Sequence, residues 1–114
     1  RAFVRHNLML DRHSAADAPP SIKVRDLSGA QRGFLVDNRV RDSHPYAPFA
    51  AAHVQPEFGT LQAADGQTLY YRLYRPAGAA PAAVIVHMYG GPGGQLVNRG
   101  WAPLWYQAAV AKGY

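Results

Sequence analysis

The sequence predicts a mixed β and α/β architecture, in which a β-rich first half precedes the opening of an α/β sheet. Three observations lead to this prediction. Short runs of strand-forming residues alternate with turn residues through the first half of the 114-residue sequence. A hairpin pattern and a continuous apolar run follow in the second half. A stretch with helical spacing of apolar residues comes last.

The first half is predicted to consist of short strands. Three are expected, over residues 2–10, 21–27 and 33–36. The middle one alternates apolar and charged side chains, which is typical of a half-exposed strand. Residues 11–20 are predicted to form a loop because they contain Asp, Ser and the Pro19-Pro20 pair, and Ser28-Gly29 predicts a turn.

Residues 37–55 show no strand or helix period. They contain Pro45 and Pro48 among small residues, and Pro56 follows directly. We interpret this stretch as a connector. The domain boundary is therefore predicted near residue 53, with one unit over 1–53 and a second over 54–114.

The second half opens with a predicted hairpin. Residues 57–63 and 68–75 have strand patterns, and the Asp65-Gly66 pair between them favours a tight type I′ turn. Residues 82–87 (AAVIVH) form a continuous apolar run, the pattern of a strand that is buried on both faces.

The glycine-rich turn GGPGG, residues 90–94, ends this run. Residues 101–112 then have helical spacing, and Gly113 stands where a helix C-terminus favours glycine. We expect Trp101, Trp105 and Tyr106 to pack this helix against the sheet rather than to bind substrate.

Composition excludes several classes of function. The net charge of +5 comes from arginines that are scattered among aspartates, which does not favour nucleic-acid binding. The sequence has no cysteine, and no apolar run approaches the roughly 18 residues of a membrane-spanning helix. No signal peptide is expected at the N-terminus. No cofactor is predicted.

Neither the histidines nor the serines form a recognisable catalytic or metal-binding pattern. The histidines lack the spacing of metal ligands, and His87 is expected to be a core or supporting residue. No serine lies in a G-x-S-x-G elbow, so none is a candidate nucleophile. The residues concerned are His6, His13, His44, His53 and His87, and Ser14, Ser21, Ser28 and Ser43.

Chemistry is predicted at Tyr89, Gly90 and Gly91. Acyl transfer needs preorganised hydrogen-bond donors for the oxygen that becomes negative in the tetrahedral intermediate. Glycines after a strand let the backbone approach a substrate closely, and the Tyr89 hydroxyl can donate from a rigid side chain. Tyr89 is therefore a candidate donor, and Gly90 and Gly91 are candidate substrate-binding residues.

The sequence resembles the prolyl oligopeptidase family of serine peptidases, and within it the bacterial dipeptidyl peptidases IV. The matching tracts are EFGTLQAADGQTLYYRLYRP (57–76), AAVIVHMYGGPGGQLV (82–97) and WYQAAVAKGY (105–114), with PPSIKVRDLSG (19–29) and HPYAPF (44–49) before them. The resemblance implies that residues 1–53 end a β-propeller and that 54–114 begin an α/β-hydrolase catalytic domain.

The resemblance also implies an activity: removal of N-terminal dipeptides with Pro or Ala in second position, through an acyl-enzyme. The family's tyrosine before the glycines, which donates to the oxyanion, corresponds to Tyr89. The nucleophilic serine, the Asp and the His follow downstream in this fold, so none of the triad is expected in this chain. Peptide substrates, a homodimer of the parent protein and export from the cytoplasm are implied as well.

Two alternatives stay open. The turn is also similar to the HGGPGG turn of proline iminopeptidases, although His87 stands three residues before Gly90. A proline iminopeptidase or esterase would carry a cap domain instead of a propeller. A non-catalytic relative that only binds partners is the other alternative.

As a fragment without the triad, the 114-residue chain is expected to be inactive. It is also expected to be unstable, because residues 82–87 lack neighbouring strands.

Overall fold

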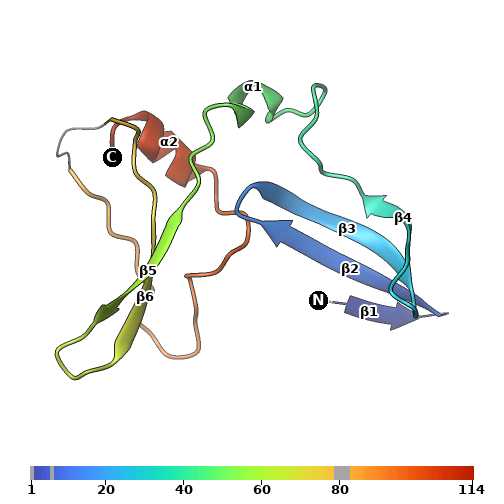
Figure 1. Cartoon of the computed structure of the whole chain (residues 1–114), viewed down its shortest axis with the longest axis horizontal. Coiled ribbons are helices and arrows are strands. Elements are labelled where there is room, and N and C mark those ends of the chain that lie inside the picture. The colour runs from blue at the N-terminus through green and yellow to red at the C-terminus, as the bar shows by residue number, and fades with distance from the viewer. Residues whose placement is uncertain (1, 6, 79–82) are drawn as a thin grey trace.

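The structure is a computed structural model that describes residues 2–5, 7–78 and 83–114. Within those ranges it has six strands in two antiparallel sheets and two short helices (Figure 1). The strands are β1 (Ala2–Arg5), β2 (Leu8–Ala15), β3 (Ala18–Asp26), β4 (Gln31–Val36), β5 (Glu57–Gln62) and β6 (Thr68–Leu73), and the helices are α1 (Ala47–Ala50) and α2 (Trp105–Ala111). The molecule is thus mixed and β-rich, as the sequence predicts.

The first sheet has four strands in the order β1-β2-β3-β4, so each strand pairs with its neighbour in the sequence. The single strand predicted over residues 2–10 is wrong. Asn7 has a φ of +62°, and the chain turns there so that β1 and β2 pair. Asparagine is one of the few residues that tolerates this left-handed conformation. His6 lies outside the described residues.

The predicted loop over residues 11–20 is also wrong, because most of it is paired strand. β2 continues to Ala15, and β3 already begins at Ala18. Pro19-Pro20 lies where the register between the two strands shifts, so the missing proline N–H groups do not interrupt a regular ladder. Across the sheet the Arg25 Nε donates to the Asp11 carboxylate at 2.8 Å. The turn at Ser28-Gly29 is confirmed, with Gly29 at a φ of +87°.

The connector is held to the C-terminal part of the chain by side chains. Within residues 37–55, all of which the structure describes, α1 is the only regular element, and the rest is irregular as predicted. His53 stacks on Trp101, with ring centroids 4.7 Å apart, and hydrogen-bonds to the Tyr46 hydroxyl. The Gln107 side-chain amide donates to the Val54 carbonyl and accepts from its N–H, both at 2.9 Å.

The second sheet is the predicted hairpin, formed by β5 and β6. Its turn is not type I′, since only Gly66 among the loop residues has a positive φ, of +83°. The Gly66 N–H donates to the Ala63 carbonyl, and the Ala63 N–H donates to the Gln67 carbonyl. This is the three-residue hairpin loop with glycine in the left-handed position. One left-handed residue was therefore needed, not two.

The strand predicted over residues 82–87 is not formed. Residues 83–87 belong to no strand and are exposed, and residue 82 lies outside the described residues. Val84 is 76% exposed and Val86 is 74% exposed. An apolar run forms a strand only where neighbouring strands pair with its backbone and other elements cover its faces, and the described strands pair elsewhere.

Helix α2 begins later than predicted, at Trp105. Pro103 explains the difference, because the residue before a proline avoids helical backbone angles. Gly113 ends the helix as expected, with a φ of +89°. The N–H groups of Gly113 and Tyr114 donate to the carbonyls of Val110 and Ala109, which together make a Schellman motif.

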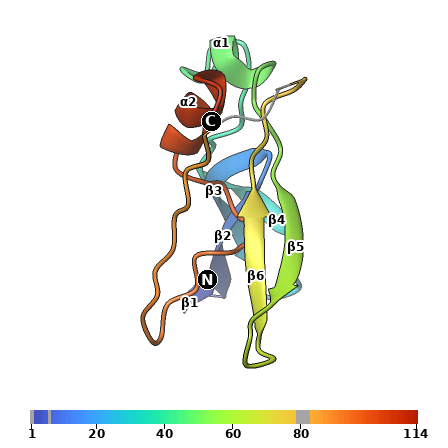
Figure 2. The same cartoon turned by 90° about the vertical axis from the view of Figure 1, so that its left-hand side faces the viewer.

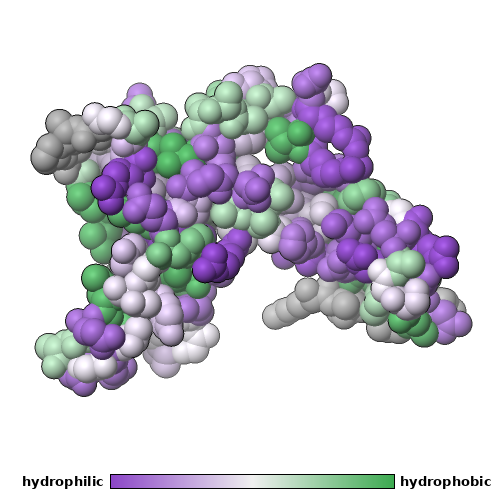
Figure 3. All heavy atoms as spheres, viewed as in Figure 1, coloured by the Kyte–Doolittle hydropathy of each residue, from purple (hydrophilic) through white to green (hydrophobic). Residues whose placement is uncertain are grey.

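The molecule is open rather than compact (Figures 1 and 2). Its radius of gyration is 17.8 Å, whereas a compact domain of this length has about 13 Å. Among residues 7–78 and 83–114 only Val110 and Ser21 are buried. Apolar residues are prominent on the part that carries the hairpin and α2, while the coloured part of the four-stranded sheet is mainly hydrophilic in this view (Figure 3). None of the described helices has the length and apolar character needed to cross a bilayer.

Candidate functional site

The glycine turn predicted to carry chemistry lies at the tip of a long loop. Residues 83–104 descend beside the hairpin, reverse and return to α2 (Figures 1 and 2). Gly90 has a φ of +67° and Gly93 a φ of +76°, so both occupy the left-handed region that side chains rarely adopt. The reversal of the chain directly after Tyr89 therefore depends on these two glycines.

The Tyr89 ring lies against the backbone of the same turn. A Cβ placed on Gly94 would come within 2.6 Å of the ring atoms Cδ1 and Cε1, and one on Gly91 within 3.1 Å of Cε1. The Tyr89 side chain is otherwise open to solvent, since the residue is 59% exposed. Among the residues that the structure describes, none is found in a hydrogen bond with its hydroxyl. The phenolic O–H is therefore accessible to a ligand.

The descending limb of the loop, residues 83–89, is attached to α2 through His87. The His87 Nδ1 hydrogen-bonds to the Tyr106 hydroxyl, and the His87 ring meets Trp105 edge-on with centroids 5.6 Å apart. His87 is exposed, so its expected place in the core is wrong for this structure, although it does support the loop. The cause is again the unpaired state of residues 83–87.

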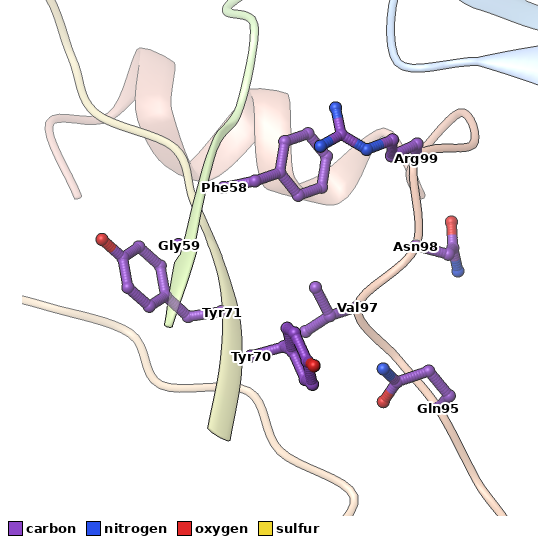
Figure 4. A pocket seen from close by; sticks show the side chains of 8 residues that line it. All are labelled: Phe58, Gly59, Tyr70, Tyr71, Gln95, Val97, Asn98 and Arg99. Atoms are coloured by element: carbon purple, nitrogen blue, oxygen red, sulfur yellow. The ribbon is translucent and has the colours of Figure 1, made fainter. Parts of the chain in front are cut away.

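The returning limb, residues 95–104, is attached to the hairpin. Arg72 donates to the Asn98 carbonyl at 3.1 Å, and the Arg99 guanidinium lies 4.9 Å from the centre of the Phe58 ring. An open groove of about 260 Å³ lies between the two segments (Figure 4). Its lining residues are Phe58, Gly59, Tyr70, Tyr71, Gln95, Val97, Asn98 and Arg99. The contacts of Asn98 and Arg99 hold the returning limb against the hairpin.

One aromatic stack joins the two attachments. Tyr74 and Tyr106 lie nearly parallel, with centroids 5.3 Å apart, and the Arg72 guanidinium is 5.4 Å from the Tyr106 ring centre. Burial raises the pKa of Tyr74 above its ordinary value, and the Arg72 charge opposes this. The alternation of residues 69–74 predicts that Tyr70, Arg72 and Tyr74 share a face, opposite to Leu69, Tyr71 and Leu73. Nothing in the sequence indicated what that face would contact.

The other residues considered as candidates have structural roles. Trp101 lies outside the helix and packs on His53, while Trp105 and Tyr106 contact His87 in the loop. These three residues pack, but the expectation that they would hold the helix against a sheet is wrong, because residues 83–87 form no strand. Across the described ranges no serine hydroxyl bonds to a histidine, and no group of three potential metal ligands is found. Burial raises the pKa of Tyr46, whose hydroxyl is bonded to His53.

The site offers a hydrogen-bond donor and a turn of backbone N–H groups, held on two limbs. It offers no nucleophile within the described residues. A comparison with models of protein families finds no match to this chain.

Proposed function

We propose that this chain belongs to a serine peptidase of the prolyl oligopeptidase family, related to the dipeptidyl peptidases IV. In this proposal the chain contributes the oxyanion donor of the active site. The enzyme removes N-terminal dipeptides with Pro or Ala in second position. The serine, aspartate and histidine of the triad come from sequence beyond these 114 residues, and Gly90 and Gly91 line the substrate site.

The observation that carries the proposal is the position of Tyr89. The residue is exposed, its ring rests on the turn, and the chain reverses at Gly90 directly after it. When a serine oxygen adds to the scissile carbonyl carbon, the carbonyl oxygen becomes negative and accepts a hydrogen bond from such a donor. Donors fixed before the reaction stabilise this charge because they need no reorganisation.

The four-stranded sheet supports a propeller in preference to a cap domain. A propeller blade is a four-stranded antiparallel sheet whose strands follow in sequence order. Strands β1 to β4 have that number and order. The short connector and the β5-β6 hairpin then lead to the loop with Tyr89. This order favours the dipeptidyl peptidase over the proline iminopeptidase.

Replacing Tyr89 by Phe tests the donor. In the full-length polypeptide that contains this sequence, we expect Tyr89→Phe to lower kcat by roughly 10²–10³-fold, the usual effect of losing one oxyanion donor, with KM little changed. The assay follows release of a chromophore from Ala-Pro-anilide. Tyr114→Phe, at an exposed tyrosine beyond the end of α2, is the matched control and should keep full activity. A loss below about threefold for Tyr89→Phe would place this residue outside the oxyanion hole.

Two further measurements separate the alternatives. Hydrolysis of Pro-anilide but not Ala-Pro-anilide would identify a proline iminopeptidase instead. Absence of labelling by a fluorophosphonate, which reacts with activated serines, would identify a protein that only binds partners. The proposed peptidase cleaves the dipeptide substrate and is labelled at a serine outside residues 1–114.

A further inference from the structure

The four glycines of the GGPGG turn divide into two pairs with different physical roles. Gly90 and Gly93 have positive φ values, and a Cβ on either would meet no atom within 4 Å. Gly91 and Gly94 have no such φ, but a Cβ on either would meet the Tyr89 ring. The first pair is required by backbone conformation, and the second by the position of one side chain.

Gly94 makes the closer of these two approaches. Carbon atoms in ordinary contact are about 3.5–4.0 Å apart, whereas a Cβ on Gly94 would lie 2.6 Å from two carbons of the ring. An alanine there would therefore displace the ring by about 1 Å. Since Tyr89 is 59% exposed, the ring has room to move outward. The substitution would relocate the hydroxyl without straining the backbone.

We infer that Gly94 is a positioning residue: by lacking a side chain, it leaves room for the Tyr89 ring against the turn, and so determines how close to the turn the Tyr89 hydroxyl lies. This inference rests on the proposed function, because a fixed hydroxyl matters only if it donates to the reacting oxygen. A hydrogen bond weakens steeply when its donor moves out of line or out of range. Gly91, at 3.1 Å, has the same role to a smaller extent.

A double-mutant cycle in the full-length polypeptide tests the inference. We expect Gly94→Ala alone to lower kcat for Ala-Pro-anilide by roughly 10–100-fold, as a displacement of about 1 Å can do, with KM and melting temperature unchanged. In the Tyr89→Phe background, Gly94→Ala should lower kcat by less than about twofold further, because the hydroxyl that it displaces is already absent. A residue that acted only on folding would give equal losses in both backgrounds.

The matched control is Gly33→Ala in β4, a glycine with an ordinary φ and no atom within 4 Å of an added Cβ. It should leave kcat unchanged. If Tyr89→Phe lowers kcat by roughly 10²–10³-fold but Gly94→Ala does not, the inference about Gly94 is wrong and the proposed function stands. Equal losses from Gly94→Ala in both backgrounds would also overturn it. If Tyr89→Phe itself has no effect, both fail together.

Discussion

Strand β3 and residues 83–89 both have strand-forming sequences, but only β3 forms a strand. β3 pairs with β2 on one side and β4 on the other, and each of its residues is at least half-buried. Residues 83–89 are apolar almost throughout, yet each of them is exposed and none pairs with another strand.

The difference shows what each pattern requires. An alternating strand such as β3 needs hydrogen-bonding neighbours and cover on one face. A continuous apolar strand needs neighbours and cover on both faces, which a chain supplies only when further sheet and helices surround it. The first requirement is met locally by hairpins of adjacent strands. The second is not met by the elements described for this chain.

The largest expected effect is on cooperativity. The isolated 114-residue chain should unfold without a single sigmoidal transition when heated, because its two sheets share almost no buried core. Circular dichroism measures this. Amide hydrogen exchange should show protection in β2 and β3 and none over residues 83–89. One cooperative transition together with protected amides in that segment would contradict the comparison.

Matched substitutions to a charged residue sharpen the comparison. Val24→Asp in β3 places a carboxylate opposite Leu10 on the paired strand and should lower the local stability of the sheet by about 1–2 kcal/mol. Ile85→Asp in the exposed segment should change the local stability of α2, to which the segment is attached through His87, by less than about 0.5 kcal/mol. Exchange rates of the β3 amides report the first value, and those of the α2 amides report the second. Equal effects at the two positions would mean that residues 83–89 are covered in solution.

The smallest expected effect is acid sensitivity of the first sheet. The hydrogen bond from Arg25 holds the pKa of Asp11 below its ordinary value, and that from Ser28 does the same for Asp26. A lowered pKa means that the stabilisation is present above the ordinary pKa of 3.8 and is lost as pH falls through the lowered values. Protection of β2 and β3 should therefore decline only below about pH 4. Asp11→Asn should flatten this pH dependence, and a carboxyl titration of Asp11 above 3.8 would disprove it.

Local chemistry made some elements predictable. The β5-β6 hairpin, the turn at Gly29 and the helix end at Gly113 follow from residues whose conformational limits act over a few positions. The errors at residues 2–10 and 11–20 have the opposite origin. There Asn7 and Pro19-Pro20 were compatible with either a loop or a paired strand, and the pairing of β2 with both neighbours decided between them.

The candidate site divides in the same way. Tyr89, Gly90 and Gly91 were predicted as site residues from the turn chemistry of the sequence and from its resemblance to a peptidase family, and their role stays a prediction. The sequence did not predict that Gly94 lies under the Tyr89 ring. It also did not predict that Tyr106 and Arg72 hold the two limbs of the loop.

The sequence by itself determined the backbone freedom of the GGPGG turn, the hairpin and the helix end, because glycine and proline restrict or release φ without reference to distant residues. The tertiary structure alone decided which apolar segments found partners. β3 found two, whereas residues 83–89 found none. Burial and strand pairing depend on residues far apart in the chain. The residues adjacent in sequence to Val24 and Val84 therefore do not determine that Val24 lies in a paired strand and that Val84 is exposed.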